Sequence, residues 1–156
     1  IDVGLLRPPV RRPGIEVHTL RREQLVAAVP SNHAIAKRDS VRLIDLRDEA
    51  FVTYPSDHRS VVYDAVLDAC QHAGFCPIEV HEVRETSTLL SFVAADLGVA
   101  LLPSSAQQAH VRGVDFLQLD DNTPPIELAM ATRSGPEPQH IGWIREHIEQ
   151  LCGPVD

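Results

Sequence analysis

The sequence predicts an α/β fold, because short apolar runs alternate with amphipathic helical stretches along most of the chain. Residues 82–104 (EVRETSTLLSFVAADLGVALLPS) show this best, since a strand end, a polar helix start, an apolar helical face and a second apolar strand follow one another. A strand that leads into a polar helix N-terminus is where α/β proteins hold small anions. We therefore expect a mostly parallel sheet with helices on both sides, in a domain that binds a small ligand.

The first half of the chain is expected to contain several short strands and one long helix. Apolar runs predict strands over residues 1–6, 25–29, 51–54 and 78–83, with a proline-rich loop after the first. One helical turn is expected within residues 41–48, and a longer helix over residues 60–73, where Gly74 supplies the stop. The inward face of the longer helix consists of apolar side chains at helical spacing, Val62, Val66, Ala69, Cys70 and Ala73.

A second amphipathic helix is expected to begin at Thr86 and Ser87, whose side-chain oxygens suit a cap, and to end at Gly98. Its apolar face consists of Leu89, Leu90, Phe92, Val93 and Leu97. Later runs predict strands over residues 99–102, 114–119 and 126–132, and a short helix over residues 104–110. A last helix, over about residues 139–152, carries its apolar side chains on one face, namely Ile141, Ile144, Ile148 and Leu151.

Composition excludes some partners. The chain has 156 residues, a size that fits one domain, and no apolar run approaches the roughly 18 residues that a membrane span needs. Lys and Arg number 14 against 22 Asp and Glu, which gives a formal net charge of −8. Because DNA binding depends on placing cations on phosphates, this segment is not expected to read DNA.

The three cysteines are Cys70, Cys76 and Cys152, and they lack CxxC spacing. Their pattern favours buried thiols in a protein of a reduced, cytoplasmic compartment.

The sequence contains no recognisable catalytic or metal-binding motif. Ser104 and Ser105 lack the glycine pattern of a nucleophile elbow and have no evident His or Asp partner. The histidines at positions 33, 58, 72 and 110 are scattered, without HExxH or a comparable ligand spacing. We therefore expect no catalytic residue, no metal and no cofactor.

The loop YPSDHR, residues 54–59, is the first candidate binding segment, because it joins a strand to the start of a helix. Ser56 and Arg59 would add side-chain donors to the backbone N–H groups, and Tyr54 an aromatic wall. The alternative is an N-cap loop with a solvated arginine. Thr86 is a second candidate. It either only caps its helix or also binds the carboxylate of a ligand.

Several stretches, in order along the chain, resemble the effector-binding domain of LysR-type transcriptional regulators. The pattern E-x-x-T-x-L-x-x-V-A-A-x-x-G-V-A-L-L-P-x-S carries most of the resemblance. DVGLLR, EQLVAAVPSNH, DLRDEAFVTYP, AGFCP and GVDFLQL are similar to other parts of the same domain. YPS together with EVRET is most similar to the branch of the family that responds to aromatic acids and muconate.

The resemblance implies an α/β, type 2 periplasmic-binding-protein-like fold, which is a bilobal Rossmann-like domain with one lobe complete here and one partial. Residues 1–22 and 122–156 would belong to the partial lobe and residues 23–121 to the complete one. It also implies that this chain lacks the family's winged helix-turn-helix and the start of its effector domain, which the absence of an initial methionine likewise suggests.

The resemblance also implies ligand contacts for Pro55 and Ser56, and an apolar contact for Ile126. Arg7 matches a position that contacts effector in similar proteins; the alternative is a surface arginine within an arginine-rich segment. Glu85 and Arg21 match positions associated with a second, buried aromatic-acid site. They alternatively pair with each other.

The resemblance therefore implies the effector-binding domain of a bacterial transcription regulator, binding a small carboxylate, aromatic or dicarboxylic, between two lobes. It would form homo-oligomers through the helix at residues 60–73 and reach DNA only through the absent winged helix-turn-helix domain. The runner-up is a periplasmic-type solute-binding protein, which shares the bilobal architecture and would need a signal peptide. An enzyme built on the same fold is a more distant alternative.

Overall fold

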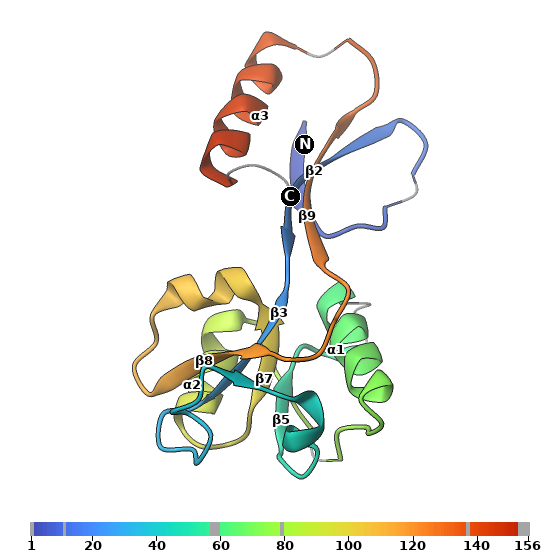
Figure 1. Ribbon diagram of the computed structural model, residues 1–156. Helices are drawn as coiled ribbons and strands as arrows, with labels where there is room; N and C mark the ends of the chain where they lie inside the picture. The colour runs from blue at the N-terminus through green and yellow to red at the C-terminus, as the bar shows by residue number, and fades with distance from the viewer. Residues whose placement is uncertain (1, 11, 57–59, 79, 137, 153–156) are drawn as a thin grey trace. The chain divides into compact units, whose positions relative to one another are not determined.

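The chain forms two compact units, which a computed structural model describes except at residues 1, 11, 57–59, 79, 137 and 153–156 (Figure 1). Unit 1 combines the two ends of the chain, Ile1–Glu23 and Pro125–Asp156. Unit 2 is the continuous segment Gln24–Pro124. Each unit has its own sheet and its own buried side chains, so the two are described separately.

Unit 1 is a three-stranded antiparallel sheet with one helix. The strand order is β1 (Val3–Leu6), β9 (Ile126–Arg133) and β2 (Ile15–Glu23), and α3 (Gln139–Cys152) packs against β2. Its buried apolar side chains are Leu20, Ile126, Ala129, Met130 and Ile141. The predicted last helix is confirmed, but its apolar face is only partly covered, since Leu151 is 87% exposed.

Strand β2 was not predicted, and its pairing with β9 shows why. Alternation of apolar and polar residues is the sequence signal of a half-buried strand, and Ile15 and Val17 follow it. The register then shifts between Thr19 and Arg21, so Leu20 is an extra residue on β2 and is buried. This bulge breaks the alternation in the middle of the strand.

Unit 2 contains a four-stranded sheet and a shorter parallel pair. The four strands lie in the order β4 (Ser40–Val41), β8 (Val114–Leu119), β3 (Leu25–Pro30) and β7 (Ala100–Pro103). Strand β5 (Phe51–Thr53) runs parallel to β6 (Val80–Glu82), and a parallel bridge joins Phe51 to Val99. The described part of the unit also contains the short 3-10 helices η1 (Leu43–Leu46) and η3 (Ser104–Ala109).

The expectation of a mostly parallel sheet is wrong for the described strands. Strand β3 runs antiparallel to both β7 and β8, and all the pairings in unit 1 are antiparallel. The reason lies in the chain path: β3 brings the chain into unit 2 and β8 leads it back out, so these neighbours run in opposite directions. Parallel pairing is found for β5 with β6 and for β4 with β8.

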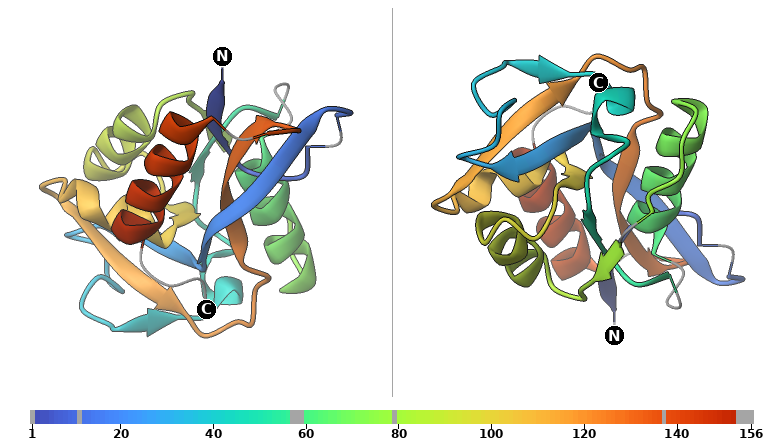
Figure 2. Two further views of the ribbon diagram at one scale, coloured as in Figure 1. Left: turned by 90° about the horizontal axis from the view of Figure 1, so that it is seen from above. Right: turned by 90° about the horizontal axis from the view of Figure 1, so that it is seen from below.

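Two helices cover the parallel strands from opposite sides, as Figures 1 and 2 show for α1 (Val61–His72) and α2 (Thr86–Ala94) on either side of β5. The predicted α1 is confirmed: Ser60 caps it by accepting the Tyr63 N–H at 3.3 Å, and Gly74 follows its end with a positive φ. Four of its five predicted inward residues are buried, namely Val62, Val66, Ala69 and Cys70.

The predicted end of α2 needs a correction. The left-handed residue after the helix is Asp96, at φ 61°, and not Gly98. The Leu97 N–H donates to Phe92 O at 3.1 Å and the Asp96 N–H to Val93 O at 3.0 Å, which is the hydrogen-bond pattern of a Schellman motif. Because the helix ends early, Leu97 leaves the apolar face and is 44% exposed, whereas Leu89, Leu90 and Val93 are buried.

Candidate functional site

The candidate site lies where β5 and β6 end. Because these strands are parallel, their carboxyl ends meet at one edge of unit 2. Residues 54–56 follow β5 there, before α1, and Glu85 follows β6, before Thr86 begins α2. We call these residues, Tyr54, Pro55, Ser56, Glu85 and Thr86, the β5–β6 edge.

Two hydroxyl groups meet at the β5–β6 edge. The Tyr54 hydroxyl and Thr86 Oγ1 are hydrogen-bonded at 2.7 Å, and both residues are half-buried. The prediction that Thr86 caps its own helix is therefore wrong: the residue before the helix is Glu85, and no side chain caps α2 in the described part of the chain. The sequence suggested capping because a local partner is the usual one for a threonine at this place. The actual partner lies 32 residues away.

The backbone N–H of Ser56 is hydrogen-bonded to a carboxylate. Its N–H donates to Glu82 Oε1 at 3.2 Å, and both residues are exposed. Sequence reasoning did not single out Glu82, although its position at the last residue of β6 places it beside the loop that follows the parallel strand β5. The Ser56 N–H thus donates a charge-assisted hydrogen bond to a side-chain carboxylate at this edge.

The start of α2 favours the same kind of ligand. Glu85 has extended backbone angles, and the absence of a side-chain cap among the described residues leaves first-turn N–H groups for other acceptors. The helix dipole adds a partial positive charge at this end. The exposed Glu85 carboxylate stands at the same end, so a bound anion would have to keep clear of it.

The other predicted site residues are divided between the units. Arg59 lies outside the described residues. Arg7 and Ile126 belong to unit 1, where Ile126 begins β9 and is 3% exposed. Arg21 also belongs to unit 1 and Glu85 to unit 2, so the pairing of these two residues stays a prediction.

Arg7 is not a solvated surface arginine. Its Nη2 forms an ion pair with Glu23 Oε2 at 2.8 Å, and its Nη1 donates to Glu127 O at 3.5 Å. Its side chain is 23% exposed, while that of Glu23 is only 1% exposed. A carboxylate removed this far from water needs charged or hydrogen-bonding partners, so Arg7 supports the sheet of unit 1 through Glu23.

Arg7→Met is expected to destabilise unit 1 by about 3 kcal/mol, because it removes the cation from a buried carboxylate. Chemical denaturation measures the loss, and Glu23→Gln in the same background should recover part of it. Arg133→Met is the matched control, since its contact with Asp2 spans 3.8 Å and both side chains are 73% exposed. An equal effect of Arg7→Met and Arg133→Met would contradict the structural role given to Arg7.

The cysteines differ in their surroundings. Cys70 is buried on α1, Cys76 is exposed and Cys152 is half-buried. Burial raises the pKa of the Cys70 thiol from its ordinary value of 9.0 to about 12, with a smaller contribution from Cys76. Since the thiolate is the reactive form, Cys70 is chemically quiet in the folded protein.

At pH 8 a thiol reagent is expected to modify Cys76 and Cys152 in the folded protein and to reach Cys70 only after unfolding. Because the folded pKa is the higher one, the neutral Cys70 thiol favours the folded state below about pH 9, and this contribution is lost as the pH rises toward 12. Timed labelling with mass spectrometry measures the order of reaction. Simultaneous labelling of all three thiols would contradict the burial of Cys70.

The described residues contain neither a metal-ligand cluster nor a membrane-spanning helix. Within the described ranges, no group of three or more His, Cys, Asp or Glu side chains is arranged to hold a metal ion. Among the helices described, none has the length and apolar character needed to cross a membrane.

The two-unit α/β architecture, with a polar edge where parallel strands lead into helices, defines the class of ligand-binding domains with the type 2 periplasmic-binding-protein-like fold. The chain belongs to the LysR substrate binding domain family, because the sequence model of that family matches residues 1–153. The resemblance found in the sequence is thereby confirmed.

The curated relatives of the chain are transcription regulators. It is 31% identical over 153 residues to the HTH-type transcriptional regulator BenM of Acinetobacter baylyi, covering 97% of this chain and 50% of that protein. It is 29% identical over 133 residues to AlsR of Bacillus subtilis, covering 85% of this chain and 44% of AlsR. The chain thus spans about half the length of these curated relatives.

Solved structures support the fold. The effector-binding domain of BenM with its effector benzoate matches 97% of this chain and 69% of that one, with a TM-score of 0.84 and 31% identity. Full-length CbnR in complex with its target DNA matches with a TM-score of 0.83 at 22% identity, covering 99% of this chain and 54% of that one. The CbnR likeness concerns the fold alone.

Proposed function

We propose that the chain is the ligand-sensing part of a LysR-type regulator and binds a small carboxylic acid, aromatic or dicarboxylic, at the β5–β6 edge. The observation that carries this proposal is the Ser56 N–H, which already donates to a carboxylate, that of Glu82, at 3.2 Å. A ligand carboxylate would take the place of the Glu82 oxygen and receive the same hydrogen bond. BenM, whose effector is benzoate, supports the class of ligand.

The hydroxyl pair of Tyr54 and Thr86 gives the edge its second recognition element. Each hydroxyl both donates and accepts, and their mutual bond at 2.7 Å uses one proton of the two. The other proton remains for a ligand oxygen. Together with the Ser56 N–H, this makes two donors available to one acid group.

The ligand would act by its differential affinity for two conformations of the domain. DNA would be bound by a separate helix-turn-helix domain, because the net charge of −8 opposes contact between this chain and phosphates. A cytoplasmic location accords with that role. A periplasmic-type solute-binding protein is not favoured, since the curated relatives of this chain are transcription regulators.

Self-association through α1 and β6 is part of the proposal. Among the described strands β6 pairs with β5 alone, so its other edge is open. Val80, the first residue of β6, is 42% exposed, and Ile78, which precedes the strand, is 84% exposed. Val80→Lys is expected to shift the chain toward monomer in sedimentation experiments, because a charge would enter the interface. Unchanged association of this variant would place the contact elsewhere.

Thermal-shift titration with benzoate, muconate, catechol and unrelated small acids tests the ligand class. A ligand that binds only the folded state raises the midpoint of unfolding in a concentration-dependent way. One acid should give a selective, saturable rise that Ser56→Ala combined with Thr86→Ala reduces. A rise given only by non-acidic compounds would contradict the proposal.

A further inference from the structure

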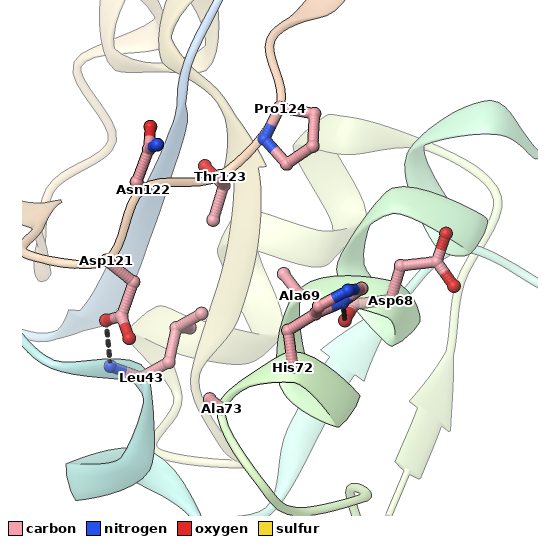
Figure 3. A pocket seen from close by; sticks show the side chains of 9 residues that line it. All are labelled: Leu43, Asp68, Ala69, His72, Ala73, Asp121, Asn122, Thr123 and Pro124. Atoms are coloured by element: carbon pink, nitrogen blue, oxygen red, sulfur yellow. Dashed lines mark hydrogen bonds between the residues drawn. The ribbon is translucent and has the colours of Figure 1, made fainter.

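Unit 2 contains a pocket of about 430 Å³ away from the β5–β6 edge. Its walls come from three places in the chain (Figure 3): Leu43 of η1, the last turns of α1, and the connector, which we define as residues 121–124. The connector is the segment through which the chain leaves β8 and approaches β9. None of the residues that line this pocket belongs to the β5–β6 edge.

The charged groups around the pocket are acidic. Asp121 Oδ2 accepts the Leu43 N–H at 2.6 Å, which fixes the side chain and leaves Oδ1 as a further acceptor. Asp68 lies on the α1 side of the pocket, and its exposed carboxylate points away from the connector (Figure 3). No Lys or Arg is among the residues that line the pocket in the described part of the chain.

His72 adds a second acceptor. Its Nδ1 lies 2.7 Å from Asp68 O, and a carbonyl oxygen only accepts, so Nδ1 carries the proton of the neutral ring. The lone pair of that ring is then on Nε2. His72 is exposed on the last turn of α1, where a ligand reaches it without a change in the helix.

Thr123 is the polar residue of the connector that is nearly buried. The residue is only 7% exposed, and within the described residues its hydroxyl has no hydrogen-bond partner. No described side-chain oxygen or nitrogen is both fully sealed from solvent and unpartnered, so the Thr123 hydroxyl keeps contact with solvent, and Thr123 is among the residues that line the pocket. A buried polar group without a protein partner is costly unless water or a ligand satisfies it.

We propose that this pocket binds a small organic cation, a primary ammonium group on a short apolar body. The ammonium group donates to Asp121 Oδ1 and to the Thr123 hydroxyl, while the side chains of Leu43, Ala69 and Pro124 contact the apolar body. The volume falls within the range of small-molecule sites, roughly 300–1,000 Å³. The net charge of −8 raises the local concentration of cations around the protein.

Occupancy would act on the connector. Asp121 and Thr123 form one wall of the pocket, and Ile126, which begins β9, follows two residues after Pro124. A ligand that holds both side chains removes conformational freedom from the segment that joins unit 2 to β9. The amine would therefore be a second ligand, bound independently of the acid at the β5–β6 edge.

Isothermal titration with putrescine and tyramine tests the pocket, with glycerol and benzoate as comparison ligands without a cationic group. Asp121→Asn is expected to weaken amine binding roughly tenfold to a hundredfold, since it removes a charge-assisted hydrogen bond. The asparagine oxygen still accepts the Leu43 N–H, which preserves the fold. Asp120→Asn is the matched control, because Asp120 is the neighbouring carboxylate, is exposed and does not line the pocket.

Saturable amine binding that Asp121→Asn and Thr123→Val weaken, and Asp120→Asn leaves unchanged, would support the proposal. Equal weakening by Asp121→Asn and Asp120→Asn would overturn it, since the amine would then respond only to surface charge. Absence of amine binding at millimolar concentration, or equal binding of glycerol, would overturn it too. Because no acid is involved, these outcomes are separate from those of the acid titration.

Discussion

Gly98→Ala is expected to destabilise unit 2 by about 3 kcal/mol, because the added methyl group has no room and the backbone angle disfavours it. A Cβ at Gly98 would lie 2.5 Å from Ala50 O, and φ at Gly98 is +147°. Ala50 O also accepts the Val99 N–H at 2.8 Å, and Val52 donates to Val99 O at 2.8 Å. The clash would thus push apart the segments that hold β5 beside β7.

Gly113→Ala is the matched control for this substitution. Its φ is +88°, so it carries a comparable backbone penalty, but its Cβ would meet Ala94 Cβ at 3.5 Å, an ordinary contact. We expect a loss of about 1 kcal/mol there. Denaturant unfolding of both variants measures the difference, and equal losses would contradict the close approach of Gly98 to Ala50.

Thr86→Val combined with Ser56→Ala is expected to weaken binding of the acid by about tenfold while the domain stays folded. Thr86→Val removes the hydroxyl that pairs with Tyr54 but keeps the side-chain volume. Its own cost in stability is about 1 kcal/mol, the value of one hydrogen bond. Titration of the acid that gives the largest thermal shift measures the change in dissociation constant.

Thr88→Val is the matched control, because it makes the same change of residue type on the same helix without removing a hydrogen bond. Thr88 lies on the same helix as Thr86 and is exposed, and the described residues offer its side chain no hydrogen bond. The substitution should therefore change neither affinity nor stability measurably. Because Ser56→Ala keeps the backbone N–H, an affinity of the double variant as high as that of Thr88→Val would show that the side-chain hydroxyls of Thr86 and Ser56 do not contact the acid.

The elements that the sequence predicted correctly are those with local signals. The bounds of α3 and β8 agree with the expected ones, because the apolar periodicity lies within each segment and a glycine or proline lies next to it in the chain. Helix α1 has its cap at Ser60 and its stop at Gly74 for the same reason. Strand β2 escaped prediction because its bulge at Leu20 is specified by its partner strand.

The site shows the same division between local and distant causes. That Tyr54, Ser56 and Thr86 lie near strand ends followed from the order of strands and helices along the chain. The hydroxyl pair of Tyr54 with Thr86 and the Ser56–Glu82 contact did not, because they join residues 32 and 26 positions apart. Likewise, no local pattern in the sequence indicates that Glu23 is buried. Its burial against Arg7 depends on how β1 and β2 flank β9.

The most direct test of the account is to follow backbone amide resonances of the chain during titration with benzoate and with the best acid from the thermal-shift panel. If the β5–β6 edge is the acid site, the largest saturable shifts will be those of Ser56, Thr86 and Ser87. Saturable shifts that leave these amides unchanged and gather at another place in unit 2 would contradict the assignment.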